Sequence, residues 1–451
     1  MRISILLSGI AAMALTACAT DDAPSESEGG DTIVVTGAKS GSSRKPRPPR
    51  SEFAESTVTE SFGDRGPTPS ISPLPRDREP RDGPAPQSGT LTAGDYDDVL
   101  NPELYKKYVD RSLQGQLAGK GLPYVDAADR IEIRARDRLG KPIPRAQLTV
   151  RTSANDVMFP LVTGADGRAF VYPRFDDLEA GVSVSLMHDG ERVDTAAITP
   201  TLLEEGGVII LNSATDARPV QKLDLVLTID ATGSMSDEMA YLQKELTAIL
   251  DRVKEGASDL DIRAGLIAYR DQGDQYVVRS FPLTDDLASF ATFLNKQEAQ
   301  GGGDFPEAMH EAMAAGLKFD WREDAAAINL LVADAPPHND KIAETWRSAL
   351  LARTRGIHIV PISGSGIDKS AEFLMRAMAQ LTGGRYIFLT DDSGVGGKHK
   401  EAEVDCYVVT RLDGLVERVI ESLVRGRRIE PSGDDVIRTV GAYRQGVCEV
   451  E

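Results

Sequence analysis

A carboxylate and three hydroxyl groups lie close together in DATGSMS at residues 230–236, directly after the apolar run LDLVLTI. Two more carboxylates stand in similar places further along the chain, Asp304 in QGGGDFPEA and Asp334 in LLVADAPPH. Carboxylate and hydroxyl oxygens suit a hard divalent cation, and Mg²⁺ binds them in near-octahedral geometry while it keeps some waters. The sequence therefore predicts a site for Mg²⁺, with Mn²⁺ or Ca²⁺ as alternatives, whose ligands are Asp230, Thr232, Ser234, Asp304 and Asp334.

Other interpretations of residues in these loops stay open. Without a metal, Thr232 and Ser236 would only cap the helix that follows them. Glu307 stands in the first turn of an expected helix, where the helix dipole accounts for a carboxylate. His338 follows the Asp334 loop and is the histidine best placed to act as a base.

The part of the chain that must position these residues begins at residue 221. Apolar strands alternate there with amphipathic helices, and the expected strands are LDLVLTI, DIRAGLIAY, AAINLLVAD, IHIVPIS and RYIFLT. Near-continuous apolar strands suit a sheet that is covered on both faces. The alternation predicts a doubly wound, mostly parallel α/β domain over residues 221–426. Because ligands bind at the carboxyl ends of such strands, we expect the three acidic loops at one edge of the sheet.

The same residues resemble the metal-ion-dependent adhesion site of the von Willebrand factor A family. Asp230, Thr232 and Ser234 match its Asp-x-Ser-x-Ser pattern, with Thr in place of the first Ser. Asp334, which ends an apolar strand, matches the last Asp of the family pattern. The resemblance covers residues 220–426. It implies a Rossmann-like fold, a bound divalent cation and a protein partner that supplies an Asp or Glu side chain.

The glycine-rich loop departs from the family pattern. The family usually offers a Thr at the position that aligns with Gly303, and Asp304 follows it here. If Asp304 binds the cation directly, its extra negative charge lowers the attraction for an anionic partner. We expect a non-enzymatic, metal-dependent protein-binding module. The alternatives are a structural envelope scaffold with an inert metal site and a metal-assisted hydrolase, although no zinc-protease, nucleophile-elbow, P-loop or dinucleotide motif occurs.

The N-terminus predicts export and a lipid anchor. Residues 1–18 contain one positive charge, an apolar run and small residues, as in a secretory signal peptide. They end in LTAC, which resembles the lipobox of bacterial lipoproteins and implies lipidation of Cys18; an ordinary cleaved signal is the alternative. Ala19 follows, which favours the outer membrane, with the protein facing the periplasm or the cell surface. Residues 19–90 are rich in Pro, Ser, Gly and charge and predict a disordered tether with one β-prone run, DTIVVTG.

Three further regions complete the predicted organisation. Residues 91–127 are expected to form a helical connector whose helix begins at Asn101-Pro102. Residues 128–215 contain short strands separated by Gly, Pro, Asp or Asn, which predict a small antiparallel β-sandwich. This region resembles carboxypeptidase-regulatory-like domains, which implies packing or spacing rather than catalysis. Residues 427–451 form a C-terminal extension.

The cysteines and the net charge give expectations about disulfide bonding and about the kind of partner. An exported chain favours a disulfide between Cys406 and Cys448, and two reduced buried thiols are the alternative. The formal net charge of -19 argues against a nucleic-acid partner, because phosphate contacts need clustered Lys and Arg. We therefore expect a protein partner of unknown identity, membrane attachment through the lipid, and no bound nucleotide.

Overall fold

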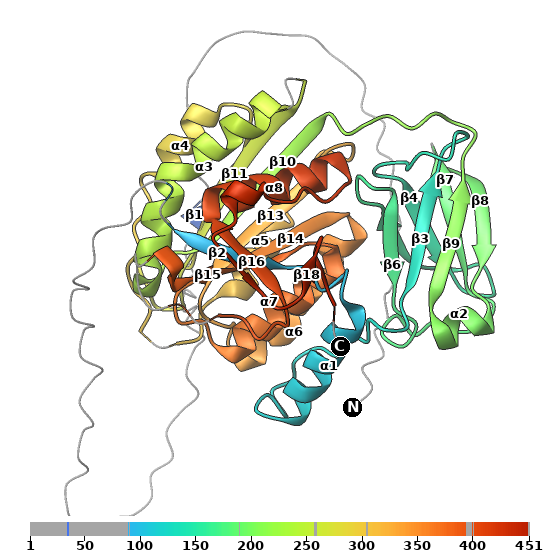
Figure 1. The fold of residues 1–451 in the computed structure, drawn as a ribbon, viewed down its shortest axis with the longest axis horizontal. Coiled ribbons are helices and arrows are strands. Elements are labelled where there is room, and N and C mark those ends of the chain that lie inside the picture. The colour runs from blue at the N-terminus through green and yellow to red at the C-terminus, as the bar shows by residue number, and fades with distance from the viewer. Residues whose placement is uncertain are drawn as a thin grey trace, which may run out of the picture. The chain divides into compact units, whose positions relative to one another are not determined.

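The computed structural model describes residues 34–35, 89, 91–188, 190–256, 259–303, 305–393, 399 and 401–449 (Figure 1). The predicted signal peptide, the lipidation residue Cys18 and nearly all of the 19–90 tether lie outside the described residues, and so does Asp304. Among the helices of the described residues, none has the length and apolar character needed to cross a bilayer.

A ten-stranded sheet forms the centre of the α/β domain, and its middle strands are parallel. In spatial order they are β11 (Asp261–Tyr269), β10 (Lys222–Asp230), β13 (Ala326–Ala333), β14 (Ile357–Ser363) and β15 (Tyr386–Thr390). Antiparallel strands extend both edges: β12 (Val278–Thr284) and β1 (Val34–Val35) beyond β11, and β2 (Thr92–Tyr96), β16 (Tyr407–Arg411) and β17 (Arg438–Val440) beyond β15. The predicted doubly wound, mostly parallel α/β fold is confirmed.

Helices cover both faces of this sheet because its strands alternate their side chains between two apolar cores (Figure 1). Along β10, Leu225 and Leu227 lie in one core and Val226 lies in the other. The first core packs against α3 (Ser236–Gly256), α4 (Leu287–Leu294) and α8 (Leu412–Arg425), and the second against α1 (Pro102–Gln114), α5 (Met309–Gly316), α6 (Ile342–Thr354) and α7 (Lys369–Thr382). Short 3-10 turns are η1 (Gly233–Met235), η2 (Asn339–Lys341), η3 (Asp391–Ser393) and η4 (Gly433–Asp435).

Strand β2 corrects the predicted helical connector at residues 91–127. Its residues enter the sheet between β15 and β16, although TAGDY has little strand propensity. The packing at Gly94 leaves no room for a side chain, because a Cβ atom there would lie 2.7 Å from the ring of Phe388 and 2.9 Å from the ring of Tyr407. Long-range packing, which local propensity does not report, therefore decides the conformation of this segment.

The C-terminal extension also belongs to the α/β domain. Strand β17 pairs with β16, and β18 (Tyr443–Arg444) pairs with β19 (Val447–Cys448) in a short hairpin. A disulfide joins Cys406 to Cys448. Asn101 holds the hairpin against α1: its amide donates to the carbonyl oxygen of Gly446 at 2.8 Å, and its Oδ1 accepts the backbone N–H of Cys448 at 2.9 Å. Its side chain therefore makes no capping hydrogen bond to the helix.

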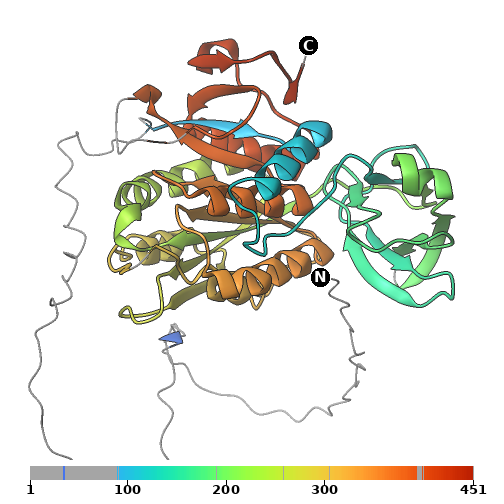
Figure 2. The same ribbon diagram turned by 90° about the horizontal axis from the view of Figure 1, so that it is seen from below.

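Residues 131–212 form two facing sheets around their own apolar core (Figure 2). One sheet has the order β6 (Arg168–Val171), β3 (Ile131–Arg136), β9 (Gly207–Asn212), and the other β5 (Val157–Val162), β4 (Gln147–Arg151), β7 (Ser183–His188), β8 (Glu191–Ala197). The expectation of a purely antiparallel sandwich is wrong in one place, because β3 and β9 are parallel. Helix α2 (Pro200–Glu205) precedes β9 and lies in the long crossover that a parallel pair requires.

The sandwich contacts the α/β domain through arginines near the start of β14. Arg353 donates to both carboxylate oxygens of Asp176, at 2.7 and 2.8 Å, and both side chains are buried. Arg145 donates to the carbonyl oxygens of Arg355, at 3.0 Å, and of Gly356. These contacts lie at the amino ends of the parallel strands, so the sandwich leaves the carboxyl ends of β10 and β13 to the acidic loops.

Candidate metal site

Asp230 is the last residue of β10 and is completely buried. Its Oδ1 accepts the backbone N–H of Thr232 at 2.9 Å and the hydroxyl of the same residue at 2.7 Å. The Thr232 Oγ1 lies 3.4 Å from the Ser234 Oγ, which places three oxygen-bearing side chains in one turn. The second carboxylate oxygen of Asp230, Oδ2, is buried and has no hydrogen-bond partner in the part of the chain that the structure describes. A buried carboxylate oxygen that accepts no hydrogen bond is suited to bind a cation.

Asp334 follows β13, the strand next to β10. The two strands are parallel and Ile229 stands opposite Val332, so Asp230 and Asp334 leave neighbouring strands at the same edge. Asp334 is buried as well. Burial, followed by the negative charge of Asp334, raises the pKa of Asp230 to about 7. The two carboxylates thus repel each other in a poorly solvated place, and a bound cation would relieve this repulsion.

The glycine-rich loop lies against the hydroxyl turn. The carbonyl oxygen of Gly301 accepts the backbone N–H of Gly233 at 3.2 Å. A Cβ atom on Gly302 would lie 3.0 Å from the Cβ of Thr232, and Gly302 has a left-handed φ of +78°. Glycine is therefore required where the loop passes Thr232. Asp304 lies outside the described residues, so its predicted ligand role stays a prediction.

Glu307 belongs to this edge, and the helix-dipole interpretation of it is wrong. The helix α5 begins only at Met309, and Glu307 is buried beside the site, with its Oε2 lacking a hydrogen-bond partner among the described residues. Burial, and then the charge of Asp230, raise the pKa of Glu307 to about 10. Its backbone N–H donates to the carbonyl oxygen of Pro336 at 3.0 Å, which holds the glycine-rich loop against the Asp334 loop.

Two further acidic side chains stand at this edge. Glu238, in the first turn of α3, is buried and accepts hydrogen bonds from the backbone and hydroxyl of Ser365 at 2.7 and 2.8 Å. Asp271, just after β11, lies 2.8 Å from the His338 Nε2, and the side chain of His338 is 28% exposed. The sequence singled out His338 as a candidate base, and the structure pairs it with a buried carboxylate.

The chemistry of this donor set fits a divalent cation. Asp230 and Asp334 are buried carboxylates, and Thr232 and Ser234 add hydroxyl oxygens. In the described residues, no three His, Cys, Asp or Glu side chains form a cluster that could hold a metal. A hydroxyl-rich Mg²⁺ site does not require such a cluster, because water completes the coordination of this ion. The buried second oxygen of Asp230 is the clearest sign of a missing positive charge.

Comparison with known proteins identifies the class of the α/β domain. Residues 224–391 match the family model of the von Willebrand factor A domain. The chain therefore contains a von Willebrand factor A domain, and the matched residues include Asp230, Thr232, Ser234 and Asp334. Domains of this family are typically metal-dependent protein-interaction modules and are generally not catalytic.

Two curated relatives match a limited part of the chain. An alpha-protein kinase of Dictyostelium discoideum is 28% identical over 122 residues, which are 27% of this chain and 20% of the kinase. A putative ariadne-like RING finger protein of Acanthamoeba polyphaga mimivirus is 27% identical over 188 residues, 37% of this chain and 18% of that protein. The chain thus spans about a fifth of the length of these relatives.

Solved structures that resemble part of this chain include the following two proteins. The conserved hypothetical protein BatB from Bacteroides thetaiotaomicron is 13% identical, covers 45% of this chain and 99% of its own, and has a TM-score of 0.30. The manganese-loaded TRAP protein of Plasmodium vivax is 20% identical, covers 36% of this chain and 64% of its own, and has a TM-score of 0.26. Similarity at this level adds nothing to the family match.

Proposed function

We propose that this protein is a non-enzymatic, metal-dependent protein-binding protein of the cell envelope. One observation carries the proposal. The buried Oδ2 of Asp230 has no hydrogen-bond partner among the described residues, and it stands at the same sheet edge as the hydroxyls of Thr232 and Ser234 and the buried carboxylate of Asp334. The proposed ligands are Asp230, Thr232, Ser234, Asp304 and Asp334. A bound Mg²⁺, Mn²⁺ or Ca²⁺ supplies an open coordination position for an Asp or Glu of the partner.

The residues of the chain explain why binding depends on the metal. Asp230, Asp334 and Asp271 are buried acidic side chains at the edge that faces the partner. Without a cation this edge repels an acidic side chain, and with one it attracts it. Thr232 fixes Asp230 through two hydrogen bonds, at 2.7 and 2.9 Å, so the chain holds one oxygen of the carboxylate and leaves the other for the cation.

The envelope location is part of the same proposal and depends on Cys18. A lipid on this residue attaches the protein to a membrane, and the 19–90 tether carries the folded domains away from it, over roughly 50 Å if it behaves as a flexible coil. The residue after the acylated Cys favours the outer membrane. The variant Cys18→Ser is expected to appear in the soluble fraction, and detergent-dependent fractionation of this variant would argue against the anchor.

A pull-down from envelope extracts tests the binding function. The bait is the chain with Cys18→Ser, in Mg²⁺ and in EDTA, beside Asp334→Ala. Asp324→Ala is the matched control, because Asp324 is exposed and precedes β13 at the opposite end of the strand. We expect a partner that only the metal-loaded wild type and the control retain. Capture that ignores both EDTA and Asp334→Ala would assign the interaction to the sandwich or the tether, and the metal site to a structural scaffold.

A metal-assisted hydrolase is the second candidate function. The pair of His338 and Asp271, 2.8 Å apart at the same edge, is the observation that favours it, because a carboxylate can orient an imidazole for general base catalysis. Hydrolysis of p-nitrophenyl phosphate that requires Mg²⁺, and that both His338→Ala and Asp334→Ala abolish, would support this function over protein binding.

A further inference from the structure

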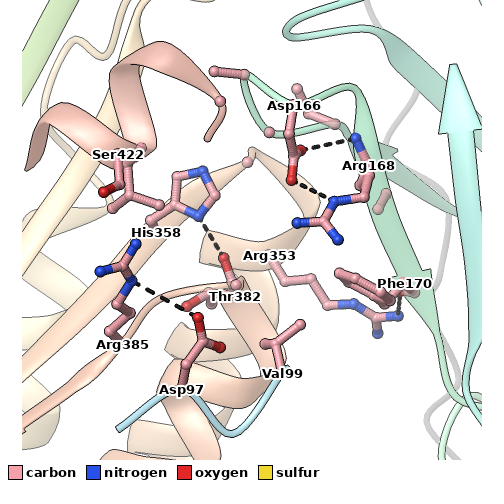
Figure 3. Close-up of a pocket in the computed structure, with 18 of the residues that line it drawn as sticks. Asp97, Val99, Asp166, Arg168, Phe170, Arg353, His358, Thr382, Arg385 and Ser422 are labelled. Carbon is pink, nitrogen blue, oxygen red and sulfur yellow. Dashed lines mark hydrogen bonds and ion pairs between the residues drawn. The ribbon is translucent and has the colours of Figure 1, made fainter. Parts of the chain in front are cut away.

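A pocket of about 140 Å³ lies between the sandwich strands β5 and β6 and the carboxyl ends of α6, α7 and α8 (Figure 3). It is distinct from the metal site. Arg385, which lines it, directly precedes β15, and His358 stands at the start of β14. The pocket is therefore at the amino ends of the parallel strands, separated from the acidic edge by the length of a seven-residue strand, roughly 20 Å.

The charged side chains that line the pocket are mostly cationic: Arg168, Arg353, Arg385, Arg427 and Arg428 stand against Asp97 and Asp166. Three of these arginines donate hydrogen bonds to carboxylates. Arg168 donates to Asp166 at 2.6 Å, Arg353 to Asp176 at 2.7 Å, and Arg428 to Asp95 at 3.0 Å. Arg385 and Arg427 are the two that need a separate explanation.

Arg385 is a largely buried residue that lines the pocket and makes only long ion-pair contacts with the described residues. Its guanidinium makes ion-pair contacts with Asp95 and Asp97 at 3.6 and 3.7 Å, which are too long for hydrogen bonds, and it donates no hydrogen bond to any described residue. Those two carboxylates accept hydrogen bonds from Arg428 instead, at 3.0 and 3.3 Å. Burial and the nearby charge of Arg428 hold the pKa of Arg385 below its ordinary value. A guanidinium that lines a pocket and donates to no described residue has donors free for an anionic ligand.

Arg427 adds a second cation at the mouth of the pocket. Its side chain is exposed, and within the described ranges it has neither an ion pair nor a hydrogen bond. The carboxyl ends of α7 and α8 reach the same pocket, and their carbonyl dipoles explain in general why cations gather here. They do not explain Arg385, because it donates to none of those carbonyls.

The remaining walls of the pocket are largely apolar. Val99, Leu161, Phe170, Leu381 and Leu423 line it together with the arginines. Small-molecule sites combine an apolar wall with a few polar groups that fix orientation. A cavity of about 150 Å³ accepts benzene, so this pocket has room for a molecule of about six heavy atoms.

We infer that this pocket binds a small organic anion, a carboxylate on a short hydrocarbon. Arg385 and Arg427 donate hydrogen bonds to the carboxylate, and the leucine and valine side chains cover the hydrocarbon. Such a ligand would contact both the sandwich, at Phe170, and the α/β domain, at Arg385. It would therefore stabilise the contact between the two, independently of the metal site.

Isothermal titration of the full chain with Cys18→Ser tests this site. The probes are butanoate, its neutral isostere butanamide, and inorganic phosphate. We expect butanoate to bind to the wild type at least tenfold more tightly than the other two. Arg385→Gln and Arg427→Gln are each expected to weaken butanoate binding at least tenfold, since each removes a charge-assisted hydrogen bond. Arg347→Gln is the control, because Arg347 is exposed on α6 and does not line the pocket.

The results separate the alternatives. A tenfold loss in either pocket variant, with the control unchanged, supports the site. If Arg385→Gln fails to fold, Arg427→Gln alone decides. Three results would overturn the inference: no butanoate binding to the wild type, equal binding of butanamide or phosphate, or wild-type affinity in every folded pocket variant.

Discussion

The charge of Asp230 should destabilise the metal-free protein, and Asp230→Asn should remove this cost. The folded state raises the pKa of this carboxyl from 3.8 to about 7. The folded protein therefore holds the proton that the unfolded chain releases, and the stability that this group contributes is lost as the pH rises between these values. At about 1.4 kcal/mol for each pKa unit, the cost is roughly 2 kcal/mol at pH 5 and about 4 kcal/mol at pH 8.

Urea denaturation in EDTA, followed by circular dichroism from pH 5 to pH 8, measures this difference. We expect the advantage of Asp230→Asn over the wild type to grow with pH by about 2 kcal/mol. Mg²⁺ at a hundred times its dissociation constant should stabilise the wild type by about 2.7 kcal/mol and leave the variant unchanged. Asp224, on the same strand, is the control, because it is a buried carboxylate that has cationic partners.

Asp224 is as buried as Asp230, but its carboxylate accepts hydrogen bonds from Arg263 and Arg322 at 2.8 to 3.0 Å. Asp224→Asn should therefore destabilise the protein, by about 1.5 to 3 kcal/mol, because it removes the buried charge to which two partly buried arginines donate. Two results would contradict this prediction: lower stability of Asp230→Asn than of the wild type in EDTA at pH 8, or a stability difference that does not change with pH. Either result would mean that the folded protein already stabilises the charge of Asp230 without a cation.

Three further predictions concern the scaffold. Gly302→Ala should weaken Mg²⁺ binding at least tenfold in calorimetry, because the added Cβ would lie 3.0 Å from the Cβ of Thr232. Gly303→Ala is the control and should not weaken binding, because the space around its Cβ is open. Cys448→Ser should lower the free energy of unfolding by up to roughly 4 kcal/mol through loss of the bridge to Cys406, and equal stability would show that the bridge does not form in solution. Gly94→Val should abolish cooperative thermal unfolding, since the side chain has no space between Phe388 and Tyr407; a wild-type melting curve would contradict the packing of β2.

The central fold and the first loop of the site follow from local sequence. Near-continuous apolar runs mark the parallel strands, and Asp230, Thr232 and Ser234 meet because they stand two residues apart in one turn. Asp334 joins them because neighbouring parallel strands end at the same edge, which is a property of the topology. The position of these residues at one edge of the sheet could therefore be predicted from the pattern alone, and their role as ligands stays a prediction.

The rest depends on packing between distant segments. Glu307 is buried because its backbone bonds to Pro336, a loop-to-loop contact that neither loop signals by itself. The sequence signal that pointed to Glu307 is its place in QGGGDFPEA, three residues after Asp304. Strand β2 is similar, since TAGDY pairs with two strands from distant parts of the chain and packs Gly94 close to Phe388 and Tyr407. Local propensity carries no information on contacts of this kind.

The most direct test of the metal site is calorimetric titration of Mg²⁺ into the full chain with Cys18→Ser at pH 8. We expect one binding event in the wild type and in the exposed control Asp324→Ala, and none in Asp334→Ala, with circular dichroism spectra that show all three folded. Loss of binding in Asp334→Ala alone would support the assignment of the acidic edge. Unchanged affinity in folded Asp334→Ala would contradict it, and with it the proposal of metal-dependent partner binding.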